Sequence, residues 1–144
     1  MPMGKIVWSS ACSVQSAYLD RQHQNLIKIV NDFNQAAARG DGTKVAYTIL
    51  NRLVQYAEKH FRDEEKLLEI ARYPAAQLNN HIREHEKLTE DIFRHCENWS
   101  SYGKEALPEI GRFLKDWLMD HILTSDMKYR KYVAQIDDSF LSVK

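Results

Sequence analysis

The apolar residues of the chain recur with the 3.6-residue period of an α-helix, and no segment alternates with period two over a useful length. The helical period runs through four stretches, residues 20–39, 43–71, 74–99 and 105–132. Glycine and proline fall at the breaks, so we expect Gly40 just past the end of the first helix and Thr43 at the cap of the second. Helices joined by short loops pack as antiparallel neighbours. The pattern therefore predicts an all-α, up-down-up-down four-helix bundle preceded by an arm at residues 1–19.

Length and charge limit the classes of protein to which the chain can belong. Its 144 residues fit a single domain, and 20 basic residues against 20 acidic ones give no net charge that would favour nucleic acid or an acidic membrane. No apolar run approaches the roughly 20 residues of a membrane span, and the N-terminus does not resemble a signal peptide. We expect a soluble, cytoplasmic protein. Cys12 and Cys96 form no paired motif, so buried or unreactive thiols are the expectation for both.

Histidines occupy positions in the apolar stripes where a plain bundle would have leucine or isoleucine. His60 and Glu64 are four residues apart and share one face of the second helix, as His81 and His85 do in the third. One histidine on such a stripe is more often a hydrogen-bonded core residue than a metal ligand. Here, however, every helix contributes at least one. The full set is His23, His60, Glu64, His81, His85, His121 and Asp126.

The connectivity brings these seven residues to one end of the bundle, because the starts of helices one and three lie beside the ends of helices two and four. Buried imidazoles and carboxylates without partners would cost several kcal/mol each, so a metal site is favoured over a coincidental polar core. Iron suits this donor set best, ahead of zinc, manganese or copper. Seven ligands exceed the needs of one ion and would fit two metals about 3.5 Å apart. Glu64 and Asp126 are then the bridging carboxylates.

Several nearby polar residues are not expected to be ligands. His95 is about 15 Å of helix beyond His85, which is too far. Four carboxylates differ in helical phase and are expected on a solvated face; these are Asp63, Glu65, Glu84 and Glu86. In a regular helix Asp126 would be rotated by about 140° from His121 and would point away from the metals. We therefore predict a π-type turn between Leu118 and Asp126.

The motifs that carry these residues resemble those of the hemerythrin family. His23, "HFRDE" (residues 60–64), "HIREH" (81–85) and "HILTSD" (121–126) follow its H, HxxxE, HxxxH, HxxxxD pattern. The flanking segments "LDRQH", "HFRDEEKLLEIARYP" and "WLMDHILTSDMKY" resemble bacteriohemerythrins in particular, and the resemblance extends over about residues 8 to 132.

The resemblance implies a non-haem di-iron centre that binds dioxygen reversibly. One iron would be held by His81, His85 and His121 and the other by His23 and His60, and an oxo or hydroxo group would bridge both irons together with the carboxylates of Glu64 and Asp126. The first iron would then have six ligands and the second five, which leaves the second a vacancy for dioxygen. An oxygen carrier, reservoir or delivery protein is expected rather than an enzyme. The alternatives are a di-iron enzyme that reduces peroxide or oxidises iron, and a module that senses dioxygen or nitric oxide.

Five residues are expected to line the dioxygen pocket: Ser16, Phe61, Trp117, Leu118 and Ile122. Ordinary core packing explains the spacing of the last four equally well. Ser16 stands where bacteriohemerythrins commonly have an aliphatic residue. Its hydroxyl could reach the pocket and speed autoxidation, or it could face solvent or a backbone carbonyl on the arm.

Overall fold

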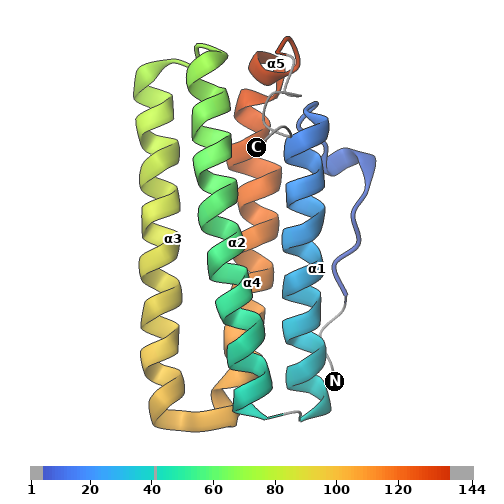
Figure 1. The fold of residues 1–144 in the computed structure, drawn as a ribbon, viewed down its shortest axis with the longest axis vertical. Helices are drawn as coiled ribbons and strands as arrows, with labels where there is room; N and C mark the ends of the chain where they lie inside the picture. Colours follow the sequence, from blue (N-terminus) through green and yellow to red (C-terminus); the bar gives the residue numbers. More distant parts are fainter. Residues whose placement is uncertain (1–4, 41, 137–144) are drawn as a thin grey trace.

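The computed structural model describes residues 5–40 and 42–136. Four long helices run antiparallel to their neighbours in sequence, so the predicted up-down-up-down bundle is confirmed (Figure 1). They are α1 (Ala17–Arg39), α2 (Thr43–Ile70), α3 (Ala75–Tyr102) and α4 (Leu107–Asp120). The described residues contain no strand.

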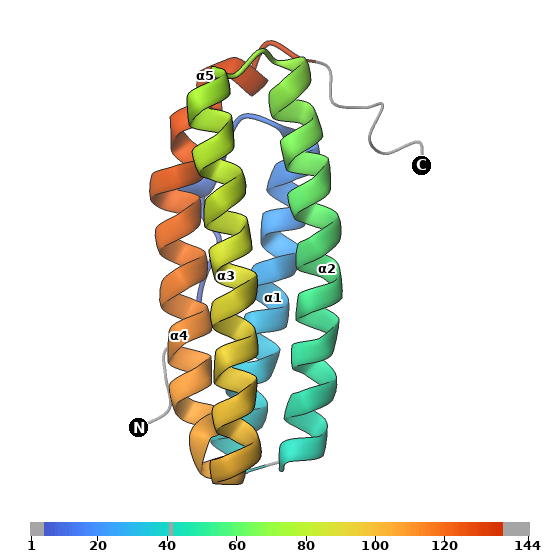
Figure 2. The same cartoon turned by 90° about the vertical axis from the view of Figure 1, so that its left-hand side faces the viewer.

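The fourth helix does not end at Asp120 but changes its winding. A π-helical turn, η3 (His121–Ser125), follows α4, and then a 3-10 turn, η4 (Asp126–Tyr129), and the short helix α5 (Arg130–Val133). These segments cap one end of the bundle, beside the loop between α2 and α3 (Figure 2). Two further 3-10 turns are η1 (Ser10–Cys12) in the arm and η2 (Gly103–Ala106) before α4.

The helix ends follow local sequence signals. Gly40 adopts the left-handed conformation (φ 69°), as expected past the end of α1, and its N–H donates to Ala36 O and Ala37 O. The cap position of α2 is occupied by Gly42, not by Thr43, which is the first helical residue; this corrects the predicted cap. Helix α1 begins three residues earlier than predicted because the Ser16 hydroxyl accepts a hydrogen bond from Leu19 N (3.2 Å) and caps it.

The N-terminal arm runs alongside α1 and is attached to it by hydrogen bonds (Figure 1). The Asn31 side chain pairs with the backbone N–H and C=O of Ile6, both at 2.9 Å. Nearer the start of α1, the Asp20 carboxylate accepts from the Ser13 hydroxyl (2.6 Å) and from Val14 N (2.9 Å). Cys12 is buried as a free thiol, as predicted. The side chain of Cys96 lies outside the described part of the structure.

The apolar core falls into two clusters with the polar residues between them. The main apolar cluster draws on all four helices and includes Leu26, Phe33, Leu53, Leu88 and Leu114. The end cluster consists of Val14, Leu19, Leu67, Leu68, Tyr73, Tyr129 and Val133. Along α1 the order is Leu19, His23, Leu26, so the histidine lies between the two clusters.

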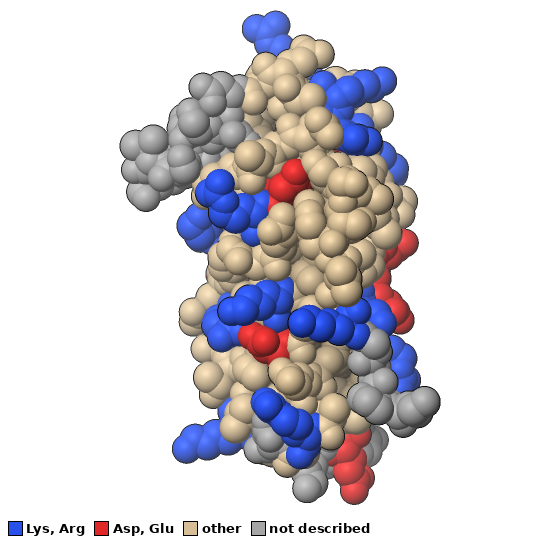
Figure 3. Space-filling model, turned by 90° about the vertical axis from the view of Figure 1, so that its right-hand side faces the viewer, with Lys and Arg blue, Asp and Glu red and all other residues tan. Residues whose placement is uncertain are grey.

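The charges of the neutral chain are not evenly distributed over its surface. On the side of the bundle where the arm lies, Lys and Arg side chains outnumber Asp and Glu side chains (Figure 3). Among the described residues, no helix is both long and apolar enough to span a membrane.

Candidate metal centre

All seven residues predicted as ligands come together, and none is more than 6% exposed. Their ligand atoms form two groups in which every pair of atoms lies within 4.8 Å. One group is Glu64, His81, His85 and His121; the other is His23, His60, Glu64 and Asp126. We call His81, His85 and His121 the three-histidine side, and His23 and His60 the two-histidine side. Glu64 belongs to both groups.

The π-helical turn brings Asp126 into this centre, as predicted from its five-residue spacing. The Asp126 N–H donates to His121 O, a bond from residue i to residue i−5 that replaces the usual i to i−4 bond. The extra residue per turn returns Asp126 to the face that carries His121. Both side chains are consequently buried in the same layer.

The Glu64 carboxylate divides its two oxygens between the two sides. Oε1 lies 2.6 Å from His81 Nε2 and 3.1 Å from His85 Nε2. Oε2 lies 3.3 Å from His60 Nε2 and 3.6 Å from His23 Nε2. One carboxylate oxygen therefore faces each set of histidines, which is the arrangement of a bridging ligand.

Asp126 repeats this division from the opposite helix. Its Oδ1 lies 3.2 Å from both His81 Nε2 and His121 Nε2. Its Oδ2 lies 3.1 Å from His23 Nε2. Two carboxylates thus span the same pair of histidine sets.

Several polar atoms of the centre are buried without a hydrogen-bond partner in the described residues. They are both ring nitrogens of His23, Nε2 of His85, Nε2 of His121 and both carboxylate oxygens of Asp126. An unsatisfied buried polar group costs about 1–3 kcal/mol, and more when charged. Imidazole nitrogens and carboxylate oxygens that converge in this way fit metal cations.

Without metal, protons take the place of cations between these groups. Burial lowers the pKa of His23, but the adjacent carboxylates of Asp126 and Glu64 outweigh it and raise that pKa to about 10. The pKa of His81 is also raised to about 10, since the effect of Glu64 and Asp126 exceeds that of burial. For Glu64 burial acts in the opposite direction, yet His60 and His81 hold its pKa well below the usual range.

Tyr129 holds the Glu64 carboxylate from the side of the end cluster. Its hydroxyl donates to Glu64 Oε2 at 2.7 Å, and its side chain is fully buried. Burial and the charges of Asp126 and Glu64 raise the pKa of Tyr129 well above its usual value, so it remains a donor. The sequence analysis did not identify this residue. The sequence feature that could have identified it is its position three residues after Asp126, because residues three apart lie on one side of a 3-10 turn.

Two carboxylates predicted to be solvated lie near the outer nitrogens of histidines. His85 Nδ1 is 2.7 Å from Glu65 Oε2, and His121 Nδ1 is 3.5 Å from Glu84 Oε2. For Glu65, which is 27% exposed, the prediction was wrong because helical phase alone ignores the reach of a glutamate side chain. Glu84 is 44% exposed, as predicted for a solvated face, although one of its oxygens lies near His121. Glu86 is exposed, as predicted.

A third carboxylate predicted to be solvated, Asp63, is 4% exposed and belongs to an outer network. Its Oδ2 accepts from the Gln22 amide (2.9 Å), the Tyr18 hydroxyl (2.9 Å) and the Lys59 ammonium (3.0 Å). Burial raises the pKa of Asp63, but these three donors outweigh it and lower the pKa below the usual value. Gln22 in turn contacts His60 Nδ1 at 2.7 Å.

The predicted pocket residues lie beside the histidines, with one exception. The Phe61 ring stacks on His85 (3.9 Å between centroids, 9° between planes), and the Trp117 ring stacks on His121 (5.4 Å, 18°). Leu118 and Ile122 are buried in the main apolar cluster. The exception is Ser16, which is buried as the cap of α1. A role for Ser16 in a dioxygen pocket stays a prediction.

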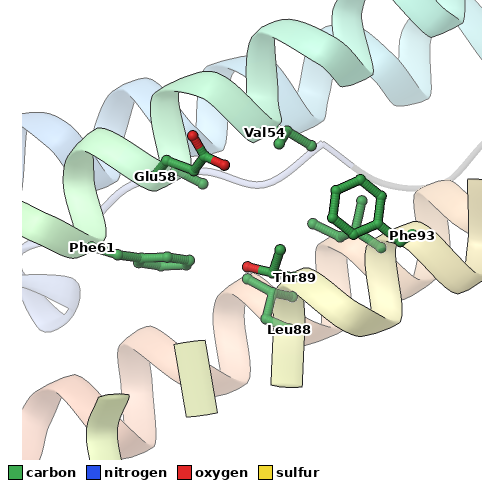
Figure 4. A pocket seen from close by; sticks show the side chains of 8 residues that line it. Val54, Glu58, Phe61, Leu88, Thr89 and Phe93 are labelled. Atoms are coloured by element: carbon green, nitrogen blue, oxygen red, sulfur yellow. The ribbon is translucent and has the colours of Figure 1, made fainter. Parts of the chain in front are cut away.

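A small pocket opens between α2 and α3 next to this aromatic cover (Figure 4). Its volume is about 10 Å³, close to the space that one water-sized molecule needs. Val54, Leu88 and Phe93 lie along it, and Phe61 forms one end.

His95 belongs to neither group of ligand atoms. The centroid of its ring lies 4.3 Å from that of Phe113.

Comparison with known proteins assigns the chain that carries this centre to a family. The family model described as "Hemerythrin HHE cation binding domain" matches residues 15–133, which include all seven residues. The chain belongs to the hemerythrin family. Hemerythrins bind dioxygen at a di-iron site and are generally not enzymes. The donor set described above fits such a site.

Individual relatives agree with this assignment. The chain is 27% identical to a bacteriohemerythrin of Stenotrophomonas maltophilia over 131 residues, covering 91% of this chain and 83% of the relative. It is also 27% identical to a bacteriohemerythrin of Methylococcus capsulatus, covering 88% of this chain and 95% of the relative. The crystal structure of a wild-type hemerythrin superposes with a TM-score of 0.74 at 24% identity, covering 91% of this chain and 99% of that one. At that identity the structure supports the fold alone.

Proposed function

We propose that this chain binds dioxygen reversibly and acts as an oxygen carrier, reservoir or delivery protein. The observation that carries the proposal is the division of two buried carboxylates, Glu64 and Asp126, between two sets of histidines. A single metal on one side would use only the carboxylate oxygens that face that side. Two iron ions, when bound, supply the two electrons that reversible dioxygen binding needs.

The ligands divide unequally between the two positions. His81, His85 and His121 would hold one iron, and His23 and His60 the other, with Glu64, Asp126 and an oxo or hydroxo group as bridges. The two-histidine side has one fewer protein ligand. It is therefore the side at which dioxygen would bind.

The protein's part in reversible binding is to keep water and free protons away from the centre. The ligands are buried, and the aromatic rings of Phe61 and Trp117 cover His85 and His121. Leu118 and Ile122 continue this apolar cover. The Tyr129 hydroxyl already donates to Glu64, so its proton is held at a defined atom.

The test is an anaerobic titration of the reduced, iron-loaded protein with dioxygen. A carrier should develop a visible charge-transfer band that fades on degassing and returns over repeated cycles, with two irons per chain by metal analysis. Steady turnover of peroxide or ferrous iron would instead indicate an enzyme. A centre that binds nitric oxide but does not release dioxygen would indicate a sensor, and one zinc per chain would contradict the proposal.

The remaining expectations about partners and location stay predictions. They are a cytoplasmic location, dioxygen as the partner with nitric oxide as the alternative ligand, and no nucleic-acid or membrane partner.

A further inference from the structure

The outer ring nitrogens of the site histidines meet different chemical groups on the two sides of the centre. On the three-histidine side they meet carboxylates: Glu65 at 2.7 Å from His85 Nδ1 and Glu84 at 3.5 Å from His121 Nδ1. Glu65 is within hydrogen-bond distance, whereas Glu84 acts through its charge. Negative charge therefore stands behind two of the three histidines on this side.

No carboxylate directly contacts an outer nitrogen on the two-histidine side in the described part of the chain. His60 Nδ1 meets the neutral amide oxygen of Gln22 at 2.7 Å. His23 Nδ1 is buried and has no hydrogen-bond partner among residues 5–40 and 42–136. The nearest carboxylate behind His60, Asp63, is one residue further out, on the far side of the Gln22 amide.

The orientation of Gln22 is set by this arrangement. A carboxylate only accepts hydrogen bonds, so the Gln22 amide nitrogen must face Asp63 and its oxygen must face His60. His60 then carries its proton on Nδ1, which leaves the Nε2 lone pair free toward the centre. Tyr18 and Lys59 donate to the same Asp63 oxygen and hold that carboxylate in place.

A metal-bound imidazole whose outer N–H donates to a carboxylate is a stronger ligand than one that donates to a neutral group. We propose that these outer hydrogen bonds make the two metal positions unequal, and that Gln22, positioned by Asp63, keeps the two-histidine side at the lower affinity. Gln22 is thus a positioning residue that acts through His60. The inference rests on the two-metal centre proposed above and adds the order in which it fills. The three-histidine side fills first and the two-histidine side empties first.

The decisive variant exchanges the two outer groups without changing the net charge. In the double variant Gln22→Glu with Asp63→Asn, the carboxylate moves one step inward and contacts His60 directly. The new amide at 63 donates to it through its nitrogen, and its one oxygen is left to accept from Tyr18 and Lys59, which in the unmodified protein share Asp63 Oδ2 with Gln22. We expect the weaker metal-binding step to tighten by about tenfold or more, within the range that outer partners of ligands control.

The matched control makes the opposite change on the other side. Glu65→Gln replaces the carboxylate behind His85 by an amide. The fold should tolerate this change because the Glu65 side chain is partly exposed (27%). The stronger step should weaken by about tenfold and the two affinities should approach each other. Gln22→Leu, which removes the acceptor from His60, should weaken the weaker step further.

The measurement is an anaerobic titration of metal-free protein with Co²⁺ and, separately, with Fe²⁺, against a competing chelator. Absorption of Co²⁺ reports each step, and metal analysis counts the ions retained per chain. Proton NMR of the Co²⁺-loaded protein supplies a readout that a merely structural role would not move. The exchangeable Nδ1–H signal of His60 should shift in the double variant and be unchanged by Glu65→Gln.

Each outcome decides a different statement. Two equal steps in the unmodified protein, or two unequal steps that the double variant leaves unchanged, would overturn the role of Gln22 while leaving the di-iron proposal intact. Binding of only one metal would instead contradict the proposed function itself. Circular dichroism shows whether the double variant folds. If it does not, the single variants Glu65→Gln and Gln22→Leu decide, and unchanged metal affinities in both would overturn the inference.

Discussion

The main apolar cluster and the metal centre lie on the same four helices but are buried for different reasons. In the main apolar cluster, side chains such as Phe33 and Leu114 are buried because removal of apolar surface from water stabilises the fold. In the metal centre, His23 and Asp126 are equally buried but have polar atoms without hydrogen-bond partners in the described residues. From this comparison we expect one half of the bundle to be stable by packing alone and the other to depend on cations.

Removal of metal should have the largest effect, and only on the end that holds the centre. A ligand that binds only the folded state contributes about 4 kcal/mol at a thousand times its dissociation constant, and the proposed centre would hold two such ions. Denaturation with and without chelator should show this loss. Hydrogen exchange should accelerate around His23 and Asp126 more than around Phe33. Equal melting of the two forms would mean that the polar layer is stable without cations.

Phe33→Ala tests the opposite half. Truncation of a fully buried phenylalanine leaves a cavity and should cost about 3–5 kcal/mol of unfolding free energy, measured by chemical denaturation. The number of metals per chain should not change, because Phe33 lies on α1 about ten residues, or three helical turns, from His23. Loss of metal in a folded Phe33→Ala protein would show that the two halves are coupled.

The pH dependence of the metal-free protein sharpens the same contrast. The pKa values of His23 and His81 are about 10 when folded against 6.5 when unfolded, so their stabilising effect is complete below pH 6.5 and lost as pH rises toward 10. Glu64 has a lowered pKa, so its contribution is lost at acidic pH. The metal-free protein should therefore be most stable between about pH 4.5 and 6.5.

Metal loading at neutral pH should displace the protons of His23 and His81, which a weakly buffered titration would detect. The His81→Ala variant should release fewer protons. A metal-free stability that rises steadily from pH 6.5 to 10 would contradict the assignment.

Tyr129→Phe should have a smaller effect because it removes one hydrogen bond and no ligand. Loss of the donor to Glu64 Oε2 should cost about 1–3 kcal/mol in the metal-free protein, measured by denaturation. Both metals should still bind. Tyr73→Phe, in the same cluster, provides a control without a bond to the centre, and a similar loss there would remove the special role of Tyr129.

The smallest effect is expected at Ser16. Ser16→Ala should cost about 1 kcal/mol because α1 loses its cap, whereas Ser16→Thr keeps the hydroxyl and should cost less. The same two variants separate the cap from the predicted pocket role. If Ser16 also reaches bound dioxygen, Ser16→Ala alone should slow autoxidation; an unchanged rate in both variants would place it outside the pocket.

The sequence predicted the bundle and brought all seven residues of the centre together, since both depend on the period and polarity of single helices. His60 with Glu64 and His81 with His85 share faces by spacing alone. The outer network could not be predicted in this way. This network joins side chains of different helices: Gln22 contacts Asp63 and His60, and Glu65 contacts His85. Such contacts depend on side-chain reach and on the rotation of one helix against another.

The start of α1 shows a second limit. The arm was predicted to extend to residue 19, but the serine cap adds three residues, Ala17 to Leu19, to the start of the helix. A cap is decided by one hydrogen bond, which the apolar period does not report. The hydrogen bond to Leu19 N therefore explains a serine at position 16 locally. The comparison with the aliphatic residue common in bacteriohemerythrins did not predict this role.

The π-helical turn determines more than the direction of Asp126. The extra residue in η3 shifts the helical phase of the residues after it by about 100°, and the tighter 3-10 turn η4 then keeps Tyr129 in line with Asp126. Tyr129 and Val133 owe their inward positions to the same shift. Regular α-helical winding over the same residues would turn all three side chains away from the bundle interior together, whereas deletion of one residue in the turn, such as Thr124, would leave Asp126 four residues from His121 and on the same face. A change of winding in this turn, without any change of length, would thus act as three simultaneous substitutions.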